Sequence, residues 1–149
     1  MIILDISNFL HYIGIAFGLG GATIATIISM KAEKNKDKEM DHAVMKLMSS
    51  ISKVIFLGLI LLVISGILLT IYAPWPLNKK MLAVKHVLVA WIFIIAIPLG
   101  RKSIKMRALV PIGKQKPSEE FLKYKKQIRG LSMINLVLWY AITFMSIFV

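Results

Sequence analysis

The sequence predicts an all-α integral membrane protein, folded as a four-helix bundle with up-down-up-down topology. Hydrophobic residues make up 58% of the 149 residues, well above the share in an ordinary globular domain. Four apolar runs are each long enough to cross the hydrocarbon core, which needs about 20 helical residues. Four such runs cannot close a β-barrel, so helices are the expected spanning elements. Short connections between them favour antiparallel neighbours.

The four membrane helices are expected in one domain over residues 1–149. The first run carries no Lys or Arg before it and is not expected to be a cleavable signal. The second helix is expected to start below the membrane, and the third to continue past Pro98. Ser118, followed by two glutamates, is typical of a helix N-cap, so the fourth helix is predicted to begin there. The expected membrane spans are about 4–30, 53–72, 81–99 and 130–149.

The positive charge is strongly asymmetric along the chain. Fifteen lysines and arginines lie in the connections 31–52 and 100–129, against two in the connection between the second and third runs. Such a bias is typical of cytoplasmic loops. We therefore expect both termini outside, the basic loops in the cytoplasm and a multi-pass protein of the cytoplasmic membrane. The net charge of +12 then serves topology and contact with the lipid bilayer, and no nucleic-acid partner is expected.

The sequence also excludes several kinds of chemistry. Cysteine is absent, so there are no disulfides, thiolate metal sites, iron–sulfur clusters or cysteine nucleophiles. No phosphate-binding glycine loop, HExxH or GxSxG motif occurs. Hydrolase activity is therefore not expected.

His11 is the first candidate site residue, because an ionisable ring inside a membrane helix is costly unless it is held. The first and third helices run in the same direction, so Lys85 and His86 fall at about the depth of His11. His42, in contrast, lies in a basic loop. Two histidines from parallel helices are typical axial ligands of a haem iron. We therefore predict a b-type haem with His11 and His86 on the iron, and with Lys85 as a propionate or substrate contact.

Small residues lie near these candidates. Gly14 and Gly18 share a helix face with His11 and are predicted to let a flat ring approach the backbone. Ser65 and Gly66 of the second membrane helix lie at similar depth. The alternative interpretation is that the glycine face serves only helix packing, as GxxxG patterns commonly do.

Two other function classes stay open from the residues alone. Met40, Met45 and Met48 lie near His42, and soft thioethers suit a copper-handling protein. A non-enzymatic accessory or assembly subunit of a membrane complex is the second alternative. We expect either a homo-oligomer or a partner membrane subunit.

Three segments resemble known membrane families. The segments LHYIGIAFGLGGA, SGILL and LAVKHVLVAWIF are similar to those of the HemJ-type protoporphyrinogen oxidases and the CopD-like putative copper-export domains. The resemblance implies that His11 is a haem ligand and Lys85 a second functional residue. It also implies an oxidoreductase that acts on a porphyrinogen or a quinone-linked substrate. The first helix departs from the HemJ pattern, which carries a tryptophan and a later arginine.

Overall fold

The computed structural model describes residues 2–34, 38–72, 78–111, 116–146 and 148, with the backbone alone for residues 32–34 and 38–42. The described secondary structure is entirely helical, which confirms the predicted class. The elements are α1 (Ile2–Ile15), η1 (Ala16–Gly20), α2 (Gly21–Lys34), α3 (Lys38–Tyr72), α4 (Lys79–Ala108) and α5 (Glu119–Met145).

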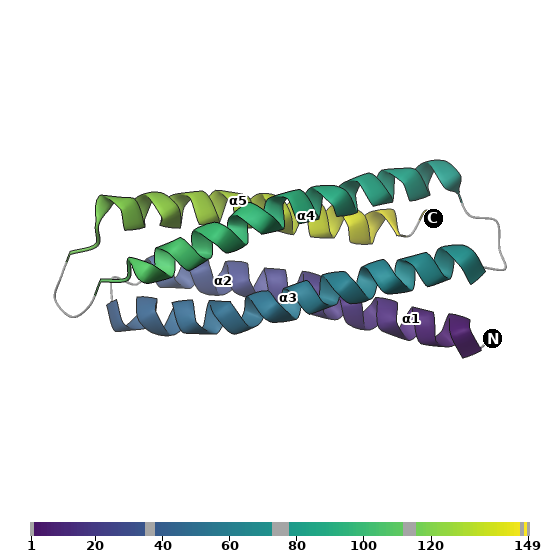
Figure 1. Ribbon diagram of the computed structural model, residues 1–149, viewed down its shortest axis with the longest axis horizontal. Helices are drawn as coiled ribbons and strands as arrows, with labels where there is room; N and C mark the ends of the chain where they lie inside the picture. Colours follow the sequence, from purple (N-terminus) through teal and green to yellow (C-terminus); the bar gives the residue numbers. More distant parts are fainter. Residues whose placement is uncertain (1, 35–37, 73–77, 112–115, 147, 149) are drawn as a thin grey trace.

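Four long rods pack side by side, and the chain runs alternately up and down the bundle (Figure 1). The first rod consists of α1, η1 and α2, and the other three are α3, α4 and α5. Each rod contains a stretch long and apolar enough to cross a membrane: Ile2–Lys31, Ala43–Tyr72, Lys79–Ala108 and Glu119–Met145. Both termini lie at one end, called the terminal end below. The opposite end, which holds the α2–α3 and α4–α5 connections, is called the basic end.

The helix boundaries follow local signals in the sequence. Ser118 caps α5 as predicted, since its side chain accepts a hydrogen bond from the Phe121 backbone N–H at 3.2 Å. Asn78 caps α4 in the same way through Met81. Helix α4 continues past Pro98, and α3 extends well beyond its apolar run. The predicted helical extensions are therefore confirmed.

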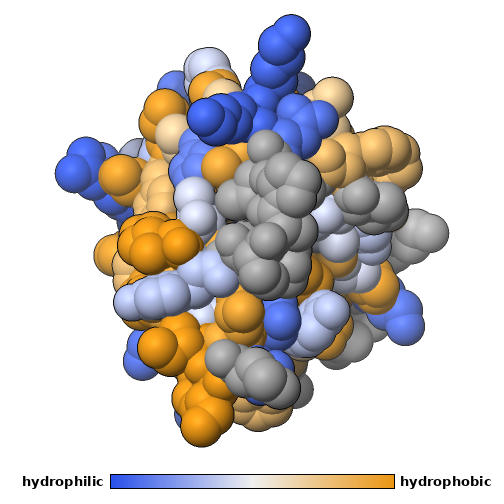
Figure 2. Space-filling model, turned by 90° about the vertical axis from the view of Figure 1, so that its right-hand side faces the viewer, coloured by the Kyte–Doolittle hydropathy of each residue, from blue (hydrophilic) through white to orange (hydrophobic). Residues whose placement is uncertain are grey.

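The packing joins two groups of helices. Helix α1 packs mainly on α3, α4 packs on α5, and α2 contacts both α3 and α5. A small core cluster at mid-height joins the groups, with contributions from α2, α3, α4 and α5: Ala22, Leu59, Ile92, Trp139 and Ile142. Many large apolar side chains point outward instead, including Val137 at 65% exposure and Ile94 at 57%. Figure 2 shows hydrophobic residues on much of the rim at the terminal end. Such a surface suits a lipid environment.

The first rod is not one regular α-helix. Residues Ala16–Gly20 form a π-helical turn, a local widening that is often found at functional sites. At this turn the backbone of Gly18 lies beneath the ring of Trp139, so that a Cβ on Gly18 would come within 2.1 Å of Trp139 Cη2. A Cβ on Gly58 of α3 would lie 2.5 Å from the Gly18 backbone N. The first rod, α3 and α5 therefore approach one another closely at this turn.

Candidate functional site

A cavity of about 580 Å³ occupies the terminal half of the bundle. All four rods line it, and its wall is mainly apolar, as in most small-molecule sites. We call it the terminal cavity. Its polar lining includes three of the residues predicted for the site: His11, Lys85 and His86. The structure therefore brings together residues that lie about 75 positions apart in the sequence.

His11 is held by a specific hydrogen bond. Its ring Nδ1 lies 2.9 Å from Ser65 Oγ, and Ser65 Oγ donates to the Leu62 carbonyl at 3.2 Å. The ring tautomer that completes both contacts carries its proton on His11 Nδ1 and donates it to Ser65 Oγ, while the Ser65 hydroxyl donates to Leu62. The Nε2 atom then carries the lone pair, and no described residue hydrogen-bonds it. Ser65 itself is 0% exposed, so the side chain that holds His11 is buried where α1 packs on α3.

The His86 ring also makes its hydrogen bond through Nδ1. Its Nδ1 lies 2.7 Å from the carbonyl oxygen of Leu82, one turn earlier on α4. A carbonyl only accepts, so Nδ1 carries the proton and Nε2 of the neutral ring is the acceptor. His86 is exposed, whereas Lys85 is half-buried. Both line the terminal cavity, and Lys85 has no hydrogen-bond or ion-pair partner among the described residues.

The predicted small residues divide into two groups. Gly66 lines the cavity, and a Cβ on it would meet nothing within 4 Å. Gly14 and Gly18 do not line the cavity. A Cβ on Gly14 would meet Leu62 Cγ at 2.8 Å, and one on Gly18 would meet the Trp139 ring. Gly14 and Gly18 therefore take part in helix packing, and the structure does not bring them together with His11, Lys85 and His86 in the cavity wall.

Sequence reasoning missed several residues of the cavity wall. Asn8 and Tyr12 flank His11 on α1, and Thr143 and Ser146 come from α5. Asn8 is one turn before His11, so helical spacing alone would have placed it near the site. The α5 residues carry no comparable signal, because their inclusion depends on the rotation of that helix.

The copper interpretation concerned a cluster near His42. The side chains of Met40 and His42 lie outside the described residues. Met45 and Met48 line a second, smaller cavity toward the basic end. Among the described residues, no group of three or more His, Cys, Asp or Glu side chains is arranged to hold a metal ion.

Comparison with known proteins places the chain in a family. The family model described as "Predicted integral membrane protein (DUF2269)" matches residues 5–149. The chain belongs to this family. No curated protein and no solved structure matches it significantly. Together, the family and the four long apolar helices identify a multi-pass integral membrane protein.

Proposed function

We propose that the terminal cavity binds a b-type haem and that the protein takes part in membrane redox chemistry. The observation that carries this proposal is the hydrogen bond from His11 to Ser65. Metal-ligating histidines almost always donate their other ring N–H to a fixed partner, which sets the tautomer and the ring orientation. His11 has this arrangement beside a cavity of about 580 Å³.

The other residues that line the terminal cavity suit a haem. The apolar wall suits the faces of a porphyrin, and the open space at Gly66 leaves room beside α3. The ammonium of Lys85 suits a propionate carboxylate. His86 offers a second imidazole Nε2 on the same cavity. A haem bound in this way supplies one-electron chemistry, and the protein contributes its ligands, its burial and its orientation.

We also propose a membrane, an orientation and a substrate class for the protein. We place it in the cytoplasmic membrane with the basic end inside, because Lys and Arg concentrate there. The terminal cavity then lies in the outer leaflet. The suggested relation to the HemJ-type families makes a hydrophobic reduced compound, such as a porphyrinogen or a quinol, the class of substrate to test first.

The test is the absorption spectrum of the protein purified from cells supplied with haem. We expect a Soret band and a reduced spectrum typical of b-haem. His11→Ala should lose the band, whereas His42→Ala, which removes a histidine outside the four candidate spans, should keep it. Lys85→Gln should retain iron ligation but lower haem content. A colourless wild-type protein, or an unchanged spectrum in His11→Ala, would contradict the proposal.

A further inference from the structure

The terminal cavity opens toward the outside of the bundle between α3 and α4. Five of the residues that line it are also exposed, whereas its lining residues on α5 are all buried or half-buried. Four of the five lie on α3 and α4: Ile67, Thr70, His86 and Ala90. The fifth is Tyr12 on α1. Residues that line a cavity and are also exposed lie at its opening, so we call these four residues of α3 and α4 the mouth.

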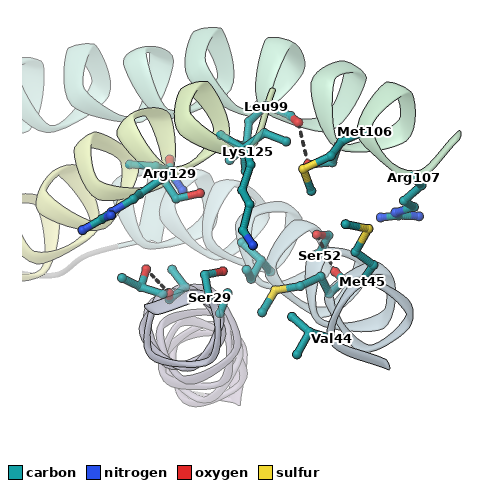
Figure 3. A pocket seen from close by; sticks show the side chains of 18 residues that line it. Ser29, Val44, Met45, Ser52, Leu99, Met106, Arg107, Lys125 and Arg129 are labelled. Carbon is teal, nitrogen blue, oxygen red and sulfur yellow. Dashed lines mark hydrogen bonds between the residues drawn. The ribbon is translucent and has the colours of Figure 1, made fainter. Parts of the chain in front are cut away.

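The packing of the helices explains an opening at this place. Helix α4 packs closely on α5, and α3 on the first rod, but the backbones of α3 and α4 do not pack closely on each other in the described part of the chain. Toward the basic end, side chains close the seam between them. Arg107 of α4 donates to Ser49 Oγ of α3 at 2.8 Å, and Figure 3 shows Met106 and Arg107 directed toward α3. The cavity there measures only about 150 Å³, against about 580 Å³ in the terminal half.

The mouth faces lipid rather than water. Thr70 and Ala90 are its residues nearest to and farthest from the α3–α4 connection. At 1.5 Å per residue, the mouth extends from about 3 to about 17 Å below the helix ends at Tyr72 and Lys79. Both helices belong to candidate membrane spans here, and the hydrocarbon core is about 30 Å thick. A ligand that enters through the mouth must therefore dissolve in one half of the bilayer.

The two polar side chains of the mouth both offer hydrogen-bond acceptors. The Thr70 hydroxyl donates to the Gly66 carbonyl at 2.8 Å, which leaves the lone pairs of its oxygen for a ligand. The His86 Nδ1–H donates to the Leu82 carbonyl, so Nε2 of the neutral ring is an acceptor. A ligand that pairs with both groups needs O–H or N–H donors, because a carbonyl oxygen only accepts.

We propose that the mouth admits and binds a lipid-soluble hydroquinone, whose ring hydroxyls donate to His86 Nε2 and Thr70 Oγ1. The inference rests on the proposed function, because a redox site in the terminal cavity needs a redox-active ligand. A hydroquinone combines that property with two donors and solubility in lipid. In the oxidised quinone both hydroxyls are replaced by carbonyls, which only accept, so the mouth favours the reduced compound.

Size also separates a hydroquinone from a porphyrinogen. A porphyrinogen is about as large as a haem, so the two would compete for one cavity of about 580 Å³. A compound with a single ring needs only the mouth. His11, which is half-buried, remains the proposed protein ligand of the iron, and the exposed His86 contacts the substrate.

The test measures binding of durohydroquinone to the detergent-purified protein by calorimetry, without oxygen and with any haem already reduced, so that no electron transfer accompanies binding. The dimethyl ether of durohydroquinone has the same ring and no hydroxyl donor, and it should bind about tenfold more weakly. His86→Leu and Thr70→Val should each weaken hydroquinone binding about fivefold and leave the affinity for the ether unchanged. His86→Gln keeps an acceptor and should retain most of the affinity.

Ala90→Phe tests the position of the mouth, because the added ring fills the opening and should weaken both ligands at least tenfold. The matched control is Ala83→Phe, which adds the same ring at an exposed position on α4 outside the cavity and should leave both affinities unchanged. Equal affinity for the two ligands, unchanged binding in His86→Leu, or equal effects of the two phenylalanine variants would overturn the inference. The visible spectrum of the same samples tests the haem separately. A colourless protein with these binding preferences would support the mouth and contradict the haem proposal, whereas a haem-containing protein without them would contradict the mouth alone.

Discussion

The contact between Gly18 and Trp139 leads to a quantitative prediction for Gly18→Ala. The added Cβ would lie 2.1 Å from Trp139 Cη2 and 2.5 Å from Cζ3. Carbons normally approach to about 3.5–4.0 Å, so the ring or the backbone must move by roughly 1.4 Å. Trp139 is 1% exposed and belongs to the core cluster, so it has little room to move. Overpacking of this kind costs about 1–3 kcal/mol.

Alanine also recovers part of that cost, because glycine is about 1 kcal/mol less favourable than alanine inside a helix. We therefore expect Gly18→Ala to lower the free energy of unfolding by up to about 2 kcal/mol. Gly66→Ala is the matched control, since its Cβ meets nothing within 4 Å. That variant should be equally stable or more stable by about 0.5–1 kcal/mol.

Thermal unfolding in detergent, followed by circular dichroism, measures both variants. From highest to lowest, the expected order of melting temperature is Gly66→Ala, wild type and then Gly18→Ala. Each kcal/mol should shift the melting temperature by about 2–4 °C for a chain of this size. If Gly18→Ala melts at or above the wild-type temperature, then Trp139 does not pack on the π-helical turn and the described junction of the three rods is wrong.

Three further predictions concern the terminal cavity and one helix end. Ser65→Ala removes the acceptor for His11 Nδ1–H, and loss of such a hydrogen bond typically weakens metal ligation 10–100-fold. Titration of the apoprotein with haem should show this loss of affinity. An unchanged affinity would mean that Ser65 does not orient the His11 ring. Gly66→Leu should fold normally but fill the cavity, so haem content should fall while the melting temperature holds; full haem content would place the ligand elsewhere. Ser118→Ala removes the α5 N-cap and should lower the free energy of unfolding by about 1 kcal/mol, with haem content unaffected. The same thermal unfolding experiment measures the change in stability. No loss of stability would contradict the assigned cap.

The main features of the fold were predictable from sequence because each depends on a local signal. Apolar runs set the four spans, and Ser118 marked the start of α5. The continuation of α4 past Pro98 followed from the apolar and basic pattern beyond it. The π-helical turn at Ala16–Gly20 was not predicted, and the Trp139 ring that packs on it comes from a helix about 120 residues later in the sequence. The same contact gave the glycine face its packing role.

The membrane depth of the site residues was predictable from the sequence, but the rotation of each helix about its own axis was not. Antiparallel topology alone brings His11, Lys85 and His86 to the same end of the bundle, and the structure confirms that they share a cavity. Residues 85 and 86 differ by about 100° around their helix, so sequence could not say which points inward. In the structure both residues line the terminal cavity, with Lys85 half-buried and His86 exposed. The partnership of His11 with Ser65 likewise depends on how α1 crosses α3.

The central claim is that His11 holds a haem iron inside the terminal cavity. The most direct measurement is the reduced-minus-oxidised spectrum of wild type and His11→Ala, purified in parallel from haem-supplied cells and matched for folded protein by circular dichroism. The account predicts a b-haem signal in the wild type and its loss in the variant without loss of helicity. A folded wild-type protein with no haem signal, or a variant with the full signal, would contradict it.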